Sequence, residues 1–260
     1  MECRICERMT VGFGSARIMH KYDVSYFRCP ACGFVQSEEP YWLAEAYSEP
    51  IAAGDVGLVS RNVQLAKTTE RVIKVGFSPG GPFLDYGGGY GLLVRLMRDA
   101  GYDFYRYDRW CPNLFAQGLD WEPATPRQFE LVTAYEVFEH LTEPVPELKR
   151  MLQLSHNVLF STVLLPPGNP GPGEWWYYAP ESGQHVSLYT RRALETLAER
   201  FLLRLLTDGQ GLHLLTEKVV GKMLFRLAVG RRSGRWLDGW RRRKSLLADD
   251  FQRLTGRPLA

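Results

Sequence analysis

Four cysteines near the N-terminus could hold one metal ion. They form two pairs, Cys3-x2-Cys6 and Cys29-x2-Cys32, with 22 residues between the pairs. Each pair brings two thiolates to one tight turn, and two such turns complete a tetrahedral set of sulfur ligands. Gly33, directly after the last cysteine, can take the positive φ that the turn needs. The spacing therefore predicts a structural Zn²⁺ site with no position left open for a substrate.

Two disulfides, or one redox-active pair, are the alternatives to zinc. The first residues, MECRIC, lack the layout of a secretory leader, so we expect a cytoplasmic protein, and disulfides are disfavoured there. A redox function would account for one pair only. A segment of this length is too short to hold a core of its own, and a bound metal would replace that core.

A glycine-rich loop could bind a cofactor through its backbone. The residues from 85 to 91 read DYGGGYG, with Gly87, Gly89 and Gly91 behind Asp85. Glycine is needed where a ligand approaches the backbone, because a Cβ would block the approach. A second predicted strand ends at Asp108, where a carboxylate can accept hydrogen bonds from ribose hydroxyls. Without that acid, the loop would be equally typical of a tight turn.

Acids and a histidine follow the third predicted strand. The segment 129–141 reads FELVTAYEVFEHL, which places Glu136, Glu139 and His140 after the strand. In an open α/β sheet, the loops at the carboxyl ends of the strands face the ligand. An imidazole with a pKa near 6.5 suits a general base at neutral pH. The alternative is that Glu139 and His140 only cap and orient the turn.

An aromatic segment supplies a second candidate base. Residues 174–189 read EWWYYAPESGQHVSLY and include His185. Aromatic faces suit a carbohydrate ring or a planar acceptor. The alternative is a hydrophobic lid that packs on the sheet.

The segments between these motifs alternate between strand and helix patterns. We expect strands at 83–86, 102–107, 129–135 and 158–165, and helices at 92–100, 147–154 and 191–200. Residues 201–207 and 212–220 read as an antiparallel pair. Residues 40–75 read as mainly helical, with a break near Pro50 and Gly54. This alternation predicts an α/β fold built on a mostly parallel sheet. The predicted domains are a ribbon at 1–39, an α/β domain at 40–220 and a tail at 221–260.

The tail carries a local excess of positive charge. Of 32 basic and 29 acidic residues, nine basic and one acidic lie in 222–244, so the remainder has a net charge of 23 − 28 = −5. Apolar residues alternate with these cations at helical spacing. Three interpretations stay open: a helix packed on the body, a helix on an anionic membrane, and a contact with RNA.

The glycine loop, the acid at 108 and the 130–140 segment together resemble the class I S-adenosylmethionine-dependent methyltransferases over about residues 60–220. The first motif of that class is E/D-x-G-x-G-x-G, and Glu130 stands where its fourth motif usually has Asp. The resemblance implies a Rossmann-like sheet with one antiparallel strand. It implies a cofactor site of Asp85, Gly87, Gly89, Gly91, Asp108 and Glu136. The glycines would line the methionine part, Asp85 would orient its ammonium group, and Asp108 would hold the ribose. His140, Glu139 and His185 would be catalytic.

The aromatic segment is similar to a W-x-Y-x-x-P-x-x-G-Q-H stretch in zinc-ribbon methyltransferases of the sugar and small-molecule type. This similarity implies methyl transfer from S-adenosylmethionine to a small acceptor, such as a nucleotide- or lipid-linked sugar. An RNA methyltransferase is one alternative, but residues 1–39 balance five basic residues with five acidic ones. An inactive scaffold that binds S-adenosylmethionine is the other. Peripheral binding to an anionic membrane through the tail fits a lipid-linked acceptor.

Overall fold

The computed structural model describes residues 1–260 except 49–54, 126, 231, 240–242 and 260. The predicted break near Pro50 and Gly54 lies outside the described residues, as do Arg231, Trp240, Arg241 and Arg242 of the tail.

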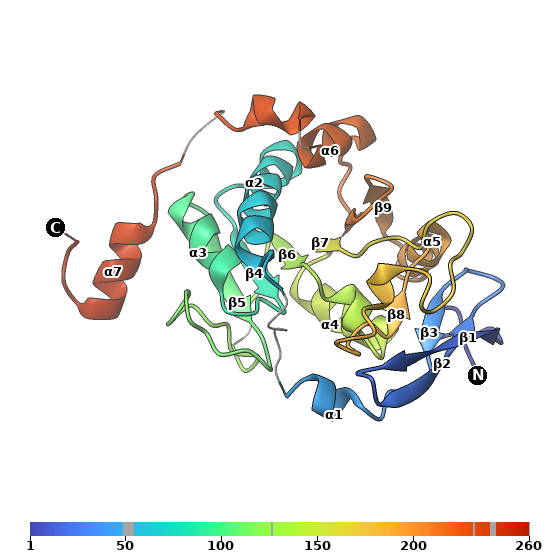
Figure 1. The fold of residues 1–260 in the computed structure, drawn as a ribbon. Coiled ribbons are helices and arrows are strands. Elements are labelled where there is room, and N and C mark those ends of the chain that lie inside the picture. The colour runs from blue at the N-terminus through green and yellow to red at the C-terminus, as the bar shows by residue number, and fades with distance from the viewer. Residues whose placement is uncertain (49–54, 126, 231, 240–242, 260) are drawn as a thin grey trace.

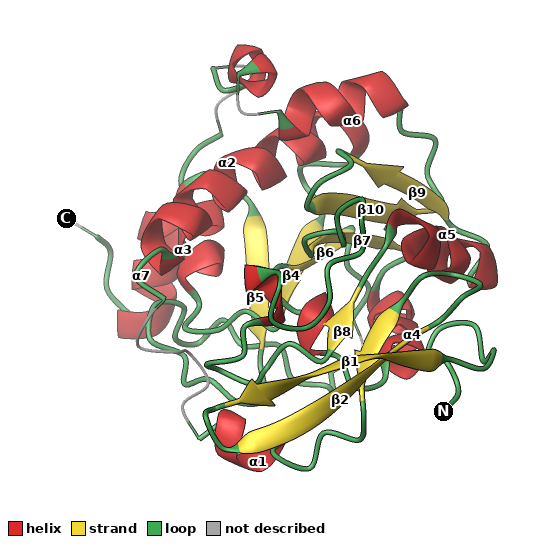
Figure 2. Ribbon diagram, turned by 45° about the vertical axis from the view of Figure 1, so that its right-hand side comes forward, coloured by secondary structure: helices red, strands yellow, loops and turns green. Residues whose placement is uncertain are grey.

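A six-stranded sheet forms the centre of the fold (Figures 1 and 2). Its strands, in spatial order, are β5 (Asp103–Tyr107), β4 (Pro82–Tyr86), β6 (Leu131–Ala134), β7 (Asn157–Ser161), β10 (Leu212–Thr216) and β9 (Arg204–Thr207). The first four run parallel, and β10 is antiparallel to both of its neighbours. The prediction of a mostly parallel sheet with one reversed strand is confirmed. Strand β7 ends four residues earlier than the predicted strand at 158–165.

Helices cover both faces of the central sheet (Figure 2). One face carries α2 (Leu58–Gly76), α3 (Leu92–Asp99) and α6 (Lys222–Val229), and the other carries α4 (Pro144–Leu154) and α5 (Arg191–Arg200). Successive strand residues point to opposite faces, so Phe83 packs with the first group and Leu84 with the second. Both faces are therefore buried, which explains why these strands are apolar runs without alternation.

The N-terminal segment forms a second sheet that a distant strand completes. Its strands are β1 (Val11–Ile18), β2 (Tyr22–Arg28), β3 (Val35–Ser37) and β8 (Ser187–Leu188). Strand β8 belongs to the segment predicted as a substrate loop, and it pairs with β3 in the register Val35–Leu188. A short helix, α1 (Leu43–Ala46), follows this sheet.

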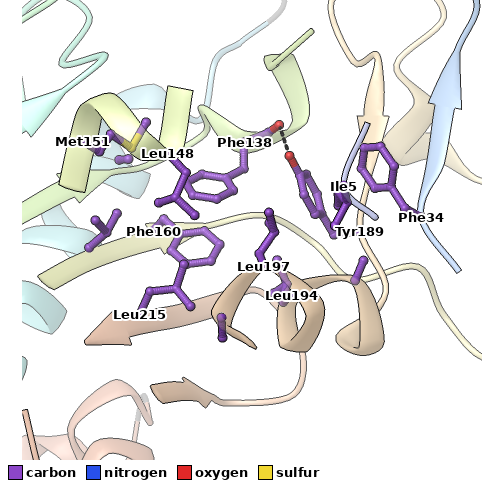
Figure 3. Close-up of a cluster of buried hydrophobic side chains, with 14 of the residues drawn as sticks. Ile5, Phe34, Phe138, Leu148, Met151, Phe160, Tyr189, Leu194, Leu197 and Leu215 are labelled. Carbon is purple, nitrogen blue, oxygen red and sulfur yellow. Dashed lines mark hydrogen bonds between the residues drawn. The ribbon is translucent and has the colours of Figure 1, made fainter. Parts of the chain in front are cut away.

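The ribbon and the central domain also share one core (Figure 3). Ile5 and Phe34 of the ribbon lie in the same cluster as Phe138, Phe160 and Tyr189. The Tyr189 hydroxyl donates a hydrogen bond of 3.0 Å to the carbonyl of Phe138. The ribbon is thus a segment of the same packed body, and this shared core stabilises it independently of the predicted metal.

The described part of the tail packs on the body, as the first of the three interpretations predicted. Helix α6 buries Phe225, Ala228 and Val229 against α2, and the 3₁₀ turn η3 (Ser233–Leu237) follows it. Helix α7 (Leu247–Thr255) places Asp250 against Arg98 of α3, with two N–O distances of 2.7 and 2.6 Å. No described helix is long and apolar enough to cross a membrane.

Candidate active site and cysteine cluster

The glycine loop joins β4 to α3 at the carboxyl end of the parallel strands. Gly87 has a φ of 70°, and a Cβ on it would lie 2.6 Å from Cγ2 of Val137. The amides of Gly87 and Gly88 both donate to the carbonyl of Tyr107, at 2.8 and 3.1 Å. Position 87 therefore requires glycine for its backbone conformation and for lack of space. The loop is fixed by the end of the neighbouring strand β5.

The Asp108 carboxylate joins the end of β5 to the same loop. Its Oδ2 accepts a hydrogen bond of 2.9 Å from the amide of Gly89. Its Oδ1 accepts hydrogen bonds of 2.8 Å from the amides of Trp110 and Cys111. Because a carboxylate oxygen has two lone pairs, Oδ2 keeps one for a further donor such as a ribose hydroxyl.

Arg106 stabilises the glycine loop, and it is not among the site residues predicted from the sequence. The guanidinium is buried, and its Nε donates to the carbonyl of Gly89 at 2.7 Å. It also donates to Asp120 at 2.6 Å and to the carbonyl of Cys111. An arginine in an otherwise apolar and aromatic strand, two residues before the strand-end acid, was the signal available in the sequence.

Asp85 lies buried at the base of the loop. The hydroxyl of Thr133 donates to its Oδ1 at 2.7 Å, and its other oxygen would lie 2.9 Å from a Cβ at Gly88. Burial raises the pKa of Asp85 to about 7, and the nearby charge of Asp108 acts in the same direction. A cationic group bound beside it would favour the ionised form.

Glu136 follows β6 in the left-handed region, with a φ of 53°. Its amide donates to the hydroxyl of Ser161 at 2.8 Å, and that hydroxyl donates to Oε1 of Glu136 at 2.6 Å. Arg61 lies 3.8 Å from its second oxygen. An uncommon backbone conformation held by two hydrogen bonds aims this carboxylate into the cavity.

The two candidate bases, His140 and His185, lie side by side and line the same cavity as the glycine loop. Their ring centroids are 4.9 Å apart, with ring planes at 89°. Nδ1 of His140 lies 3.2 Å from the carbonyl of Gln184, and Nδ1 of His185 lies 2.6 Å from the carbonyl of Tyr177. Burial lowers the pKa of His140 to about 3 and also lowers the pKa of His185. Both rings are therefore neutral at physiological pH.

Glu139 lies beside the two histidines and is fully buried. The hydroxyl of Tyr177 donates to its Oε1 at 2.6 Å. Burial, and then the charge of Glu136, raise the pKa of Glu139 to about 8. The structure thus brings together all three residues that the sequence proposed as catalytic. His140 and His185 line the cavity, whereas Glu139 lies behind them in the core.

One cavity of about 1370 Å³ contains both groups of residues. Tyr47 and Trp110 stack across it, with centroids 5.7 Å apart and planes at 19°. The side chains of the aromatic segment lie in two different environments. Tyr177 and Tyr178 are buried in the body, whereas Trp176 lies at the cavity with 72% of its surface exposed. The volume is ample for a nucleoside cofactor together with a small acceptor.

The four cysteines converge, as their spacing predicted. The Sγ atoms of Cys3 and Cys32 are 3.6 Å apart, and those of Cys6 and Cys29 are 3.4 Å apart. These distances exceed a disulfide length of about 2.0 Å and approach the sulfur separation of about 3.8 Å in a tetrahedral zinc–thiolate site. Gly33 has the predicted positive φ, at 74°. The donor set and its geometry fit a zinc ion.

A glycine loop follows β4, and acids stand at the carboxyl ends of β4 and β5. Together with the order of the central strands, this arrangement defines a nucleoside-binding α/β fold of the methyltransferase type. A family described as "Methyltransferase domain" matches residues 60–207, more than half of the chain. The chain therefore belongs to this family. Its membership confirms the prediction of an S-adenosylmethionine-dependent methyltransferase domain.

Several solved structures are similar to this chain at low sequence identity. TnmH is 17% identical, with a TM-score of 0.48 over 67% of this chain and 60% of that chain. An O-methyltransferase family 2 protein from Planctomyces limnophilus is 16% identical, with a TM-score of 0.45 over 66% and 65%. The plantazolicin methyltransferase BpumL is 12% identical, with a TM-score of 0.46 over 68% and 95%. The chain spans less than two thirds of the length of the first two. Among curated proteins, none matches this sequence.

Proposed function

We propose that the protein transfers a methyl group from S-adenosylmethionine to a small-molecule acceptor. The observation that carries this proposal is that one cavity is lined both by Gly89 and Asp108 of the glycine-loop region and by the pair His140 and His185. A cofactor held on the first group would direct its methyl group toward an acceptor held by the second.

In this proposal, the residues at the glycine loop bind and orient the cofactor. Asp108 accepts a hydrogen bond from a ribose hydroxyl through the free lone pair of Oδ2. Asp85 and Glu136 offer negative charge to the ammonium group of the cofactor. S-adenosylmethionine, when bound, supplies a methyl group activated by its sulfonium charge. Methyl transfer is an in-line displacement, so alignment of acceptor and methyl carbon provides most of the rate enhancement.

The residues at the acceptor end activate the nucleophile. Burial lowers the pKa of both His140 and His185, so each ring is neutral and can accept a proton through the nitrogen that does not face a carbonyl. Glu139 and Tyr177 fix the surroundings of this pair through their hydrogen bond. Trp176 offers an exposed aromatic face at the cavity, which suits a sugar ring. A nucleotide- or lipid-linked sugar is therefore the acceptor class we propose first.

The cysteine cluster would have a structural role. We propose that Cys3, Cys6, Cys29 and Cys32 bind one Zn²⁺ with all four positions filled. The cluster lies in the core shared by the ribbon and the central domain, not at the cavity.

A methyl-transfer assay tests the proposed function. Purified protein is incubated with S-[methyl-³H]adenosylmethionine and, in parallel, nucleotide sugars, lipid-linked sugars, free sugars and bulk RNA. Label in a sugar class supports the proposal, and label in RNA alone supports the RNA methyltransferase instead. Calorimetric binding of S-adenosylmethionine with no transfer to any acceptor class would favour the inactive scaffold.

One observation favours a second function, peripheral membrane binding by the tail. Opposite its buried face, α6 exposes Met223, Leu224 and Leu227, and η3 leaves 90% of Trp236 exposed. Basic residues flank these side chains in the sequence. Tryptophan beside arginine and lysine suits the interface of an anionic membrane. This surface, called here the tail patch, would place a lipid-linked acceptor near the cavity-bearing domain.

A further inference from the structure

Glu139, His140 and His185 are arranged as the ligands of one cation would be. One ligand atom from each residue, a carboxylate oxygen or a ring nitrogen, lies within 4.8 Å of the other two. The turn η1 (Phe138–His140) supplies two of the residues, and the segment before β8 supplies the third. Two imidazoles with one carboxylate form a donor set that binds divalent transition metals, whereas Mg²⁺ and Ca²⁺ prefer oxygen ligands alone.

Hydrogen bonds determine which imidazole nitrogen is free. A carbonyl oxygen can only accept, so the Nδ1 atoms facing the carbonyls of Gln184 and Tyr177 must carry the proton. The lone pair of each ring therefore lies on Nε2. Neutral imidazoles whose other nitrogen donates to a backbone carbonyl are the usual form of histidine metal ligands.

The second oxygen of Glu139 is the unexplained group at this place. Oε1 accepts the hydrogen bond from Tyr177, whereas Oε2 is buried and has no hydrogen-bond partner among the described residues. A buried acceptor without a partner is unfavourable, and a coordinated cation would satisfy it. The nearby carboxylate of Glu136 adds negative charge, so the site as a whole favours a doubly charged ion.

We propose that Glu139, His140 and His185 bind one divalent transition-metal ion, such as Zn²⁺, Fe²⁺ or Mn²⁺, separate from the cysteine cluster. Two of the three ligands, His140 and His185, line the cavity, so coordination positions on that side stay open for another molecule, as in catalytic rather than structural sites. The role of the ion rests on the proposed function: it would bind an oxygen of the acceptor and lower the pKa of an acceptor hydroxyl. Because the ion would occupy the lone pairs of both histidines, the hydroxyl proton would pass to water, and this metal role would replace the base role of the histidines. The oxygen would then bond to the methyl carbon while the carbon–sulfur bond breaks and its electron pair stays on sulfur.

A cobalt titration of the full-length protein distinguishes the two metal sites. The protein is first treated with a mild chelator, with zinc retained in the cysteine cluster, and is then titrated with Co²⁺. We expect one equivalent to bind with the visible spectrum of nitrogen and oxygen ligands and without a thiolate-to-cobalt charge-transfer band. His140→Gln and His185→Gln should each lose this equivalent or bind it at least tenfold more weakly. His156→Gln is the matched control, because that histidine is exposed and pairs with Glu217.

Two results would overturn the metal site. One is wild-type uptake that shows only the thiolate band. The other is equal uptake by the wild type and the two histidine variants. If a histidine variant fails to fold, as its thermal melt would show, the wild-type spectrum and Glu139→Gln decide. Binding of S-adenosylmethionine is measured separately by calorimetry, so failure of the cofactor site leaves the metal result intact, and the reverse holds as well.

Discussion

The carboxylate of Asp108 accepts a hydrogen bond of 2.9 Å from the amide of Gly89. Nineteen residues separate the two along the chain, and they come from the ends of neighbouring parallel strands. The contact makes the strand-end acid part of the glycine loop, so one side chain both shapes the backbone and faces the cavity. Its role in binding can therefore be tested separately from its role in shaping the loop.

Asp108→Ala should weaken S-adenosylmethionine binding by about 1.5–3 kcal/mol, the usual value of hydrogen bonds to a charged group. Asp108→Asn keeps an acceptor oxygen for the amide of Gly89 and should lose less. Calorimetry measures both, with Asp99→Ala, an exposed acid at the end of α3, as the control. A folded Asp108→Ala variant with an unchanged dissociation constant would remove this residue from the ribose site.

His140→Ala and His185→Ala should leave cofactor affinity nearly unchanged and reduce turnover by roughly 10²–10⁴-fold, the usual loss with an acid–base group. The reason is that neither histidine forms a hydrogen bond with the glycine loop or with Asp108 in the described part of the chain. Single-turnover kinetics with labelled cofactor provide the measurement, and His156→Ala serves as the control. Wild-type turnover in both variants would show that alignment alone accounts for catalysis.

Cys29→Ser should release the zinc of the cysteine cluster and lower the melting temperature of the whole protein. From the sequence we would expect only the first 35 or so residues to lose structure, because the ribbon reads as a separate unit. The shared core of Ile5, Phe34 and Tyr189 indicates a wider effect. Native mass spectrometry and thermal melts measure both quantities, and Cys111→Ser should keep the cluster zinc. Two disulfides in the native protein would contradict the prediction.

Asp250→Asn should lower the free energy of unfolding by about 3 kcal/mol, the lower end for a broken buried ion pair, since Arg98 keeps a second partner in Asp103. Burial alone would raise the pKa of Asp250, but the hydrogen bonds from Arg98 outweigh it and hold the pKa below its usual value. The folded pKa thus lies below the unfolded one. The stabilisation is therefore present above about pH 4 and is lost as the pH falls through the folded pKa.

Denaturant titrations between pH 7 and pH 3 check this dependence. The difference in free energy of unfolding between the wild type and Asp250→Asn should disappear as the pH falls. The free energy of unfolding of the exposed Asp99→Asn variant should differ little from that of the wild type at any pH. A constant difference between wild type and Asp250→Asn down to pH 3 would show that the ion pair does not titrate in this range.

Removing the apolar side chains of the tail patch should abolish vesicle binding without affecting stability. Leu224→Ser combined with Trp236→Ser is the test, because both side chains are largely exposed. Co-sedimentation with anionic vesicles at low salt is the measurement, and Leu202→Ser, at a more exposed leucine outside the tail, is the control. If the wild type does not bind these vesicles, the tail serves only to pack on the body.

The sequence by itself determined the class of fold and indicated most of the candidate site residues. Patterns local to the chain carried this information: the glycines of 87–91, the apolar strands beside them, and the two CxxC turns. These features need only the φ preferences of glycine, the periodicity of buried strands and the geometry of short turns. The acids at 85 and 108 were located for the same reason, since each directly ends a predicted strand.

Only the tertiary structure decided what depends on contacts between distant segments. The pairing of β8 with β3 joins residues about 150 positions apart and makes the ribbon part of the main body. The buried position of Arg106 under Gly89 depends on strand order, which no local pattern gives. The convergence of Glu139, His140 and His185 follows from the return of the chain through β8. Such long-range packing is set by the sum of many buried contacts. A local motif can therefore identify one residue of a site, but it does not reveal which residues from distant segments lie beside it.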